Sequence, residues 1–164
     1  KIYADKFFNN MKYTTKKQFE IIDELYISDF SSACDIQKLH DNGITHIVTI
    51  IPGVTAMYPK EFTYYTLDVV DRPYSSIDIY FEEAVNFIDN AIVNGGKVLI
   101  HCQQGVSRSA TIVIAYLIKK KGYTASKALE KMKKCRSCVN PNKGFMQQLE
   151  SYSQDCSNKK DSNQ

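Results

Sequence analysis

Cys102 and Arg108 are the residues of this 164-residue chain whose types and spacing most clearly indicate chemistry. They lie in segment 98–110, VLIHCQQGVSRSA, which predicts a short apolar strand, a tight loop containing Gly105 and the start of a helix. Such a loop points backbone N–H groups and a helix N-terminus at one place, where an anion such as phosphate can bind. These dipoles also favour a thiolate, so Cys102 is a candidate nucleophile. The planar guanidinium of Arg108 can bind two phosphate oxygens at once.

The segment resembles the signature of the cysteine-dependent protein tyrosine phosphatases, with His101-Cys102 separated by five residues from Arg108-Ser109. More narrowly, HCQQGVSRSA is similar to the dual-specificity phosphatases, including the catalytic domains of MAP-kinase phosphatases. The resemblance covers roughly residues 20–152 and continues through LYIS, GITHIVTI, YFEEAVNFID, AYLIKKKGYTASKAL and PNKGFMQQLE. It implies hydrolysis of phosphomonoesters on proteins, both phosphotyrosine and phosphoserine or phosphothreonine, through a phosphocysteine intermediate.

The resemblance also implies a role for each matching residue. Cys102 would attack phosphorus, while Arg108 and the loop N–H groups would stabilise the charge that spreads over the phosphoryl oxygens. Ser109 would hydrogen-bond the leaving thiolate when the intermediate breaks down, and His101 would orient the site without acting as an acid or base. Asn142 matches an asparagine that supports the phosphate loop. The residues expected to bind phosphate are Gln103, Gln104, Gly105, Val106, Ser107 and Arg108.

The general acid of this family is an aspartate upstream of the cysteine. Segment 67–73, LDVVDRP, offers two candidates, Asp68 and Asp71. Counting back from the matching YFEEA segment places Asp71 at the family's position. We therefore expect Asp71 to protonate the leaving oxygen and later to accept a proton from the attacking water. The alternative for Asp71 is a solvated loop acid before a proline turn.

The loop also narrows the substrate class. Its variable positions are uncharged: Gln103, Gln104, Val106 and Ser107. Relatives that act on inositol lipids tend to carry lysine there, so a substrate with a single phosphate is favoured. The short chain predicts a shallow cleft that accepts phosphoserine and phosphothreonine as well as phosphotyrosine.

The same residues leave other functions open. The alternatives are a phosphatase of a lipid, a glycan or an RNA 5′ end, and a pseudophosphatase that binds phosphoproteins without turnover. Low-molecular-weight tyrosine phosphatases and arsenate reductases place the acid downstream of the cysteine, which is the reverse of the order here. A rhodanese-like sulfurtransferase would not require the upstream acid or Ser109.

The chain contains an odd number of cysteines, Cys34, Cys102, Cys135, Cys138 and Cys156. They do not indicate a disulfide framework and favour an intracellular compartment, cytoplasmic or nuclear. Cys135 and Cys138 have CxxC spacing, but no second pair of ligands accompanies them, so we expect no metal and no cofactor. One hypothesis is that another cysteine, Cys34 included, protects Cys102 by a reversible disulfide after oxidation by peroxide.

Composition is typical of a folded globular domain, with 43% hydrophobic and 24% charged residues. No apolar run is long enough to span a bilayer. The net charge of +3 is too small for a dedicated nucleic-acid binder. We expect a phosphorylated protein as the partner, with a kinase as one candidate. The basic run between Lys119 and Arg136 is interpreted as a solvated helical face, with a docking patch for acidic or phosphorylated partners as the alternative.

Three segments are expected: an N-terminal extension at 1–19, either a helix or a disordered leader, a catalytic domain at 20–155, and a fraying polar tail at 156–164. Strands are predicted at 20–27, 44–51, 62–67 and 97–100. Helices are predicted at 33–41, 81–92, from 108 through the run SATIVIAYLIKK, at 123–134 and at 142–152. Strands that alternate with helices predict an α/β fold, a mostly parallel central sheet flanked by helices.

Overall fold

A five-stranded sheet forms the centre of the computed structural model, which describes residues 20–22 and 25–164. The strand order is β1-β2-β5-β3-β4, and β1 alone runs antiparallel to its neighbour. The prediction of a mostly parallel sheet in an α/β fold is therefore confirmed. The strands are β1 (Glu20–Ile22), β2 (Leu25–Ser28), β3 (His46–Ile50), β4 (Thr63–Leu67) and β5 (Val98–His101).

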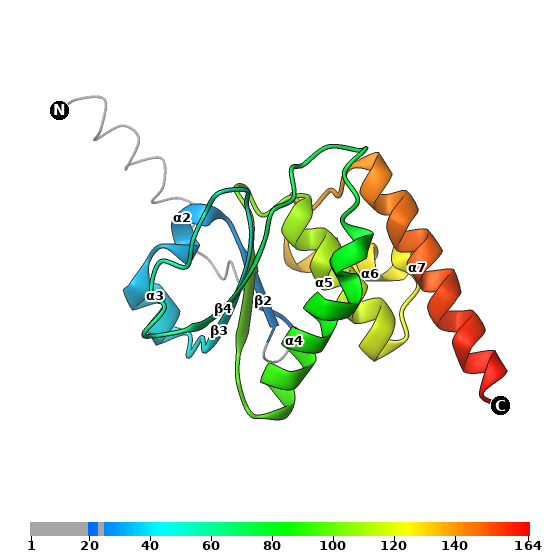
Figure 1. Cartoon of the computed structure of the whole chain (residues 1–164), viewed down its shortest axis with the longest axis horizontal. Coiled ribbons are helices and arrows are strands. Elements are labelled where there is room, and N and C mark those ends of the chain that lie inside the picture. Colours follow the sequence, from blue (N-terminus) through cyan, green and yellow to red (C-terminus); the bar gives the residue numbers. More distant parts are fainter. Residues whose placement is uncertain (1–19, 23–24) are drawn as a thin grey trace.

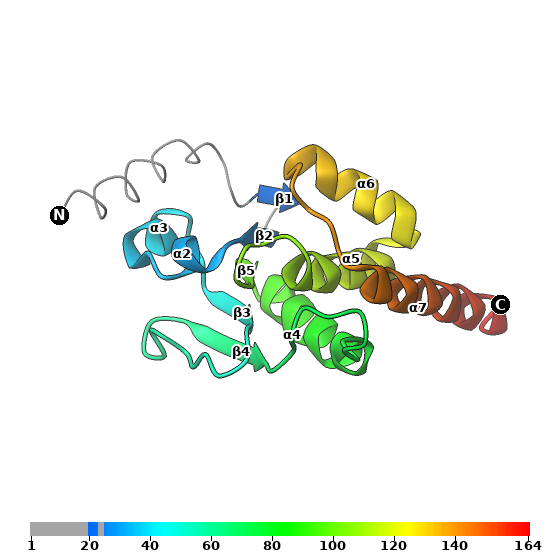
Figure 2. The ribbon, with the colours of Figure 1, turned by 90° about the horizontal axis from the view of Figure 1, so that it is seen from above.

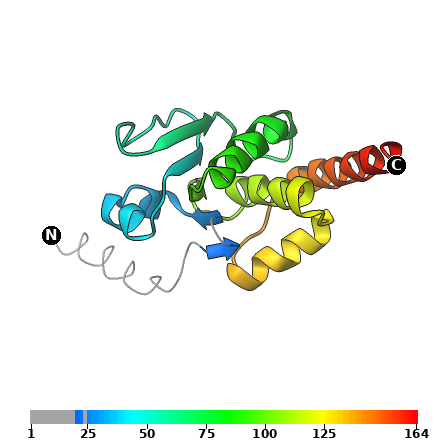
Figure 3. The ribbon, with the colours of Figure 1, turned by 90° about the horizontal axis from the view of Figure 1, so that it is seen from below.

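Helices cover both faces of the sheet. Two short helices lie on one face, α2 (Phe30–Ala33) and α3 (Ile36–Asp41) (Figure 1). The larger group packs on the other face, as Figure 2 shows from above: α4 (Phe81–Val93), α5 (Arg108–Lys121), α6 (Ala125–Cys135) and α7 (Lys143–Ser162). A 3-10 turn, η1 (Asp78–Tyr80), leads into α4. Seen from below, α6 lies beside β1 at the edge of the sheet (Figure 3).

Side chains alternate along the strands and divide the core in two. Ile47 and Leu99 point into a smaller core beneath α2 and α3. Val48 and Ile100 point into the larger core, which includes α4, α5, α6 and α7. Every residue of α5 from Ser109 to Ile118 is buried, as expected for a helix that is apolar on most faces and lies at the centre of the domain.

Two predictions at the start of the domain were wrong in detail. Segment 20–27, predicted as one edge strand, forms the antiparallel pair β1 and β2, and β2 is bonded on both sides. The helix predicted at 33–41 begins only at Ile36, as α3, and the separate helix α2 forms ahead of it and overlaps the predicted range at Ala33 alone. Asp29 and Asp35 are the reason, because each carboxylate accepts a hydrogen bond from the first turn that follows it, from Ser32 N (2.8 Å) and Lys38 N (3.1 Å).

The last helix is longer than predicted. It continues to Ser162, past the predicted end at residue 152, so most of the expected polar tail at 156–164 is helical. The apolar periodicity that predicts a buried helix stops where α7 leaves the core. Lys159 and Lys160 lie in the last turn, where positive charge stabilises the helix dipole. The expected extension at 1–19 lies outside the described residues.

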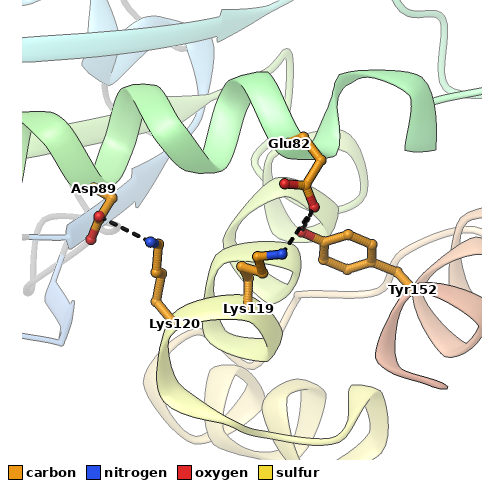
Figure 4. Close-up of polar contacts among 5 residues, drawn as sticks. All are labelled: Glu82, Asp89, Lys119, Lys120 and Tyr152. Atoms are coloured by element: carbon orange, nitrogen blue, oxygen red, sulfur yellow. Dashed lines mark hydrogen bonds and ion pairs between the residues drawn. The ribbon is translucent and has the colours of Figure 1, made fainter. Parts of the chain in front are cut away.

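Polar contacts join three helices of the larger layer (Figure 4). Glu82 on α4 accepts a hydrogen bond from the Tyr152 hydroxyl on α7 (2.8 Å) and pairs with Lys119 on α5 (3.4 Å). Lys120 pairs with Asp89 at 3.1 Å. Part of the predicted basic run therefore holds helices together. In the described part of the chain, no helix is both long and apolar enough to cross a membrane.

Candidate active site

The loop between β5 and α5 is shaped by Gly105. This residue has φ of +68° and is buried. A Cβ there would lie 2.7 Å from the Ser28 carbonyl oxygen, so both the space and the backbone conformation require glycine. A left-handed residue within such a turn directs successive N–H groups to one side of the chain, which produces a concave anion-binding surface.

A pocket of about 350 Å³ opens over this loop. It brings together the predicted nucleophile, the predicted phosphate-binding residues except Gly105, the general acid and the supporting asparagine, which come from three separate parts of the sequence. His101 and Ser109 lie next to the pocket and contact Cys102. The residues lining it are Asp71, Cys102, Gln103, Gln104, Val106, Ser107, Arg108, Asn140 and Asn142.

Cys102 lies at the base of the loop and is only 2% exposed. Its Sγ is 3.1 Å from Oγ of Ser109, in the first turn of α5. Ser109 is fully buried, so its hydroxyl is shielded from solvent beside the sulfur. A hydroxyl at this distance can donate a hydrogen bond to a thiolate, which is the arrangement that the predicted role of Ser109 requires.

Arg108 is anchored by a hydrogen bond to the segment that carries Asp71. Its Nη1 donates to the carbonyl of Val69 at 3.0 Å. Its Nε is buried and has no hydrogen-bond partner among the described residues. A buried guanidinium N–H is costly unless it is bonded, and an anion in the pocket is a partner that could satisfy it. The arrangement is therefore suited to phosphate.

Asn142 connects the candidate acid to the phosphate loop. Its Nδ2 donates to Oδ1 of Asp71 at 2.8 Å, and its backbone N–H donates to Oγ of Ser107 at 3.0 Å. Its Oδ1 accepts from Phe145 N at 2.9 Å and so caps α7. Asn142 thus fixes the positions of Asp71, the phosphate loop and the start of α7 relative to one another.

The two candidate acids are in different environments. Asp71 lines the pocket with Cys102. Asp68 instead accepts a hydrogen bond from the backbone N–H of Gly53 at 3.2 Å, and it is not among the residues that line the pocket. A general acid must reach the leaving oxygen, so this geometry favours Asp71 over Asp68.

The loop that carries Asp71 packs tightly against α7. A Cβ on Gly144 would overlap the carbonyl of Pro73. Gln148, one turn further along α7, donates to the Ser75 carbonyl at 2.9 Å and accepts from the Asp78 N–H at 3.0 Å. The position of the acid loop therefore depends on the first turns of this helix.

His101 is buried and hydrogen-bonded through both ring nitrogens. Its Nε2 is 2.8 Å from Oγ1 of Thr49 on β3, and its Nδ1 is 3.4 Å from the Cys102 carbonyl oxygen. Burial lowers the pKa of His101 to about 4, although the contact with the Cys102 carbonyl acts in the opposite direction. A neutral ring at this place fits an orienting role.

Sequence reasoning missed Thr49, Arg136 and Asn140, which all contact the catalytic loop or the histidine beside it. The backbone N–H of Asn140 donates to the Val106 carbonyl at 2.8 Å. The side chain of Arg136 donates to the carbonyls of Gln104 and Gly105, so this end of the basic run is not a solvated face as expected. Arg136 and Asn140 lie outside the segments that carry the resemblance, and nothing in the segment GITHIVTI singles out Thr49; only the tertiary structure brings the three to the loop or its histidine.

No disulfide joins the remaining cysteines, Cys34, Cys135, Cys138 and Cys156, within the part of the chain that the structure describes. Cys34 is partly buried, and burial together with the nearby Asp29 raises its pKa. Cys135 and Cys138 are exposed at the end of α6 and in the turn that follows. The hypothesis that one of them protects Cys102 stays a prediction.

Comparison with known proteins identifies one family. The family model described as "Dual specificity phosphatase, catalytic domain" matches residues 25–155. The chain is 42% identical over 133 residues to dual specificity protein phosphatase 1B of Arabidopsis thaliana, covering 81% of this chain and 80% of that protein. It is 41% identical to dual specificity protein phosphatase 1 of the same plant, with 77% of this chain and 64% of that protein covered.

Solved structures agree with the sequence matches. The structure of DUSP15 superposes with a TM-score of 0.82 at 38% identity, covering 85% of this chain and 89% of that one. The human "tyrosine phosphatase-like serine/threonine/tyrosine-interacting protein" superposes with a TM-score of 0.81 at 35% identity, covering 85% and 97%. Both similarities extend over nearly the whole described domain.

Proposed function

We propose a mechanism at the level of residues from one premise: this chain belongs to the dual specificity phosphatase family and is a protein phosphatase of that class. Cys102, Arg108 and Asp71 carry its chemistry. The observation that supports this assignment most directly is that the three side chains line one pocket although they come from separate segments. Each is of the type that the family's reaction needs.

In the first step the Cys102 thiolate attacks phosphorus, so an S–P bond forms while the P–O bond to the leaving group breaks. Asp71 transfers its proton to the leaving oxygen. Arg108 and the loop N–H groups of Gln103 to Arg108 stabilise the charge on the equatorial oxygens. Asn142 keeps the Asp71 carboxyl in place through the 2.8 Å contact.

In the second step a water molecule attacks phosphorus of the phosphocysteine and breaks the S–P bond. The Asp71 carboxylate accepts a proton from this water, which restores the acid for the next cycle. The departing sulfur becomes a thiolate again, and the Ser109 hydroxyl at 3.1 Å donates a hydrogen bond to it. His101 stays neutral and fixes the backbone at Cys102.

The substrates we propose are proteins that carry phosphotyrosine, phosphoserine or phosphothreonine, with a phosphorylated kinase as one candidate. The variable side chains of the loop are uncharged, which supports a single phosphate group rather than a polyphosphorylated lipid. We also propose a catalytic domain at 20–155 and a signalling role inside the cell, in the cytoplasm or nucleus. The odd number of scattered cysteines supports a reducing compartment.

Hydrolysis of p-nitrophenyl phosphate, measured with EDTA present, tests the proposal. Wild-type protein should turn over and be inhibited by vanadate, a phosphate analogue. Cys102→Ser should lose the activity, whereas Cys138→Ser should keep it, because this second cysteine is exposed and outside the pocket. Activity that survives in Cys102→Ser would overturn the proposed nucleophile. A folded wild-type protein that binds vanadate without turnover would indicate a phosphate-binding pseudoenzyme.

Peptides carrying phosphotyrosine, phosphoserine or phosphothreonine in one shared sequence then test the substrate class. We expect all three to be hydrolysed, because the short chain predicts a shallow cleft that admits the shorter phosphoserine and phosphothreonine side chains as well as phosphotyrosine. Activity on phosphotyrosine alone would contradict dual specificity. Activity confined to a phospholipid or an RNA 5′ phosphate would replace the protein substrate with another phosphomonoester.

A further inference from the structure

Four successive carbonyl groups of the phosphate loop accept hydrogen bonds from residues outside the loop. The Gln103 carbonyl accepts from Phe30 N at 3.0 Å, and the Val106 carbonyl accepts from Asn140 N at 2.8 Å. The two carbonyls between them are both held by one side chain, Arg136. Its Nη2 donates to the Gln104 carbonyl at 3.1 Å and its Nε donates to the Gly105 carbonyl at 3.0 Å.

The carbonyl contacts determine where the N–H groups point. In a trans peptide the C=O of one residue and the N–H of the next lie in one plane and point in opposite directions. The carbonyls of Gln104 and Gly105 therefore share their planes with the N–H groups of Gly105 and Val106. A group that fixes these carbonyls on the outside keeps the two N–H groups turned toward the bound phosphate.

Arg136 is itself held rigidly at the end of α6. Its backbone N–H donates to the Met132 carbonyl at 2.8 Å, and its own carbonyl accepts from Val139 N at 3.1 Å. The guanidinium lies against Gly105, where an added Cβ would come within 2.8 Å of Nη2. Arg136 is not among the residues lining the pocket, so it acts on the loop from behind.

The charge of the guanidinium contributes as well. A cation at the oxygen of a peptide group polarises that group and makes its N–H a stronger donor to an anion. Two peptide groups are affected here, those that carry the N–H groups of Gly105 and Val106. Lysine at this position would keep the charge but could not span both carbonyls with a planar fork.

We propose that Arg136 is a positioning residue of the phosphatase reaction: it sets the peptide planes of Gln104 and Gly105, so that the loop binds the transferring phosphoryl group. This inference rests on the proposed function, because it assumes that the loop binds phosphate. It assigns no contact between Arg136 and the substrate. It extends the active site to the end of α6, beyond the residues that the sequence motif includes.

The test compares Arg136→Ala and Arg136→Lys with wild type by kcat and KM for p-nitrophenyl phosphate, and by calorimetric titration with tungstate. Arg136→Ala should lower kcat/KM by about 10- to 100-fold and weaken tungstate binding by a comparable factor, because small displacements in an active site are costly. Arg136→Lys should fall between the two. Lys133→Ala, which removes an exposed charge on the same helix, should match wild type.

Several outcomes separate the possible explanations. If Arg136 only stabilised the fold, Arg136→Ala would reduce the number of active molecules while KM and the tungstate affinity of the folded fraction stayed unchanged; that result overturns the proposal. Kinetics and binding equal to those of Lys133→Ala also overturn it. A wild-type protein that binds tungstate without turnover overturns the proposed function but not the role of Arg136, because the tungstate affinities of the variants still report how well the loop binds an anion. A wild-type protein that neither binds tungstate nor turns over substrate overturns both the proposed function and the role of Arg136.

Discussion

Asp71 and Asp68 have different hydrogen-bond partners and different positions relative to the pocket. This difference gives a direct test of which one is the general acid. Asp71 is held by Asn142 in the pocket, while Asp68 bonds a loop N–H elsewhere. Asp71→Asn should lower kcat by about 10²- to 10⁴-fold for aryl phosphates with basic leaving groups, and much less for acidic ones. Rates across a graded series of leaving groups measure this, with Asp68→Asn as the matched control. If Asp68→Asn causes the larger loss, the acid is misassigned.

Arg108 differs from an ordinary phosphate-binding cation in its geometry. Its Nη1 is bonded to the Val69 carbonyl while its Nε is buried without a protein partner among the described residues. Arg108→Lys keeps the charge but removes the planar fork, so kcat/KM should fall by about 10²- to 10³-fold and vanadate inhibition should weaken. Steady-state kinetics with a vanadate titration measure both. Near-normal values would contradict the assigned phosphate contact.

Among the elements, those with strong local signals were predictable. The helices predicted at 81–92 and 123–134 match α4 and α6 closely, and both have local end signals: Thr124 caps α6 by accepting from Lys127 N at 3.3 Å, and Gly95 with Gly96 follows the end of α4. The hairpin at the start of the domain was not predictable, because periodicity does not reveal that a short strand pairs on both sides. The end of α7 was missed because its last turns bury no apolar face.

The residues of the site also fall into those that the sequence predicts and those that it does not. Residues in one contiguous motif, such as Cys102 and Arg108, could be predicted because strand, loop and helix follow one another in the sequence. Arg136 and Thr49 could not, since their contacts depend on how α6 and β3 pack around the loop. A surface-like basic run and an ordinary strand threonine carry no local sign of this.

The contact between α7 and the loop that carries Asp71 can be tested by a substitution in the helix. Gly144→Ala places a methyl group against the Pro73 carbonyl, so the first turn of α7 must move away from the loop. We expect a loss of about 1–3 kcal/mol in the free energy of unfolding, typical of overpacking, and a lower kcat for basic leaving groups because the contact from Asn142 to Asp71 is disturbed.

Urea unfolding and the leaving-group series measure these effects. Gln154→Ala, an exposed substitution further along α7, serves as the control and should change neither property. A Gly144→Ala protein as stable and active as this control would show that the loop and helix are not tightly coupled.

For the whole molecule, His101 links stability to pH. Its pKa in the folded protein is about 4, against an ordinary value of 6.5, because burial opposes protonation. Between these values the unfolded chain binds more protons than the folded one, so stability falls as pH decreases from 6.5 toward 4. The gap between the two pKa values corresponds to about 3 kcal/mol.

His101→Gln removes the titrating group, so part of this pH dependence should disappear. Free energies of unfolding measured near neutral pH and near pH 4.5 give the slope for each protein. His40→Gln, at an exposed histidine paired with Glu61, is the control. The pKa of His46 is also lowered by burial, so some slope should remain. An unchanged slope in His101→Gln would contradict the assignment of a neutral, buried ring.

The central claim is that Cys102 carries the phosphoryl group during turnover. The most direct measurement is rapid-quench mass spectrometry of Ser109→Ala during turnover, because loss of the hydroxyl 3.1 Å from the Cys102 sulfur should slow breakdown of the intermediate more than its formation. We predict one added phosphoryl group that maps to the peptide containing Cys102. Steady turnover with a phosphoryl group on another residue, or with no covalent adduct in either wild type or variant, would contradict the mechanism.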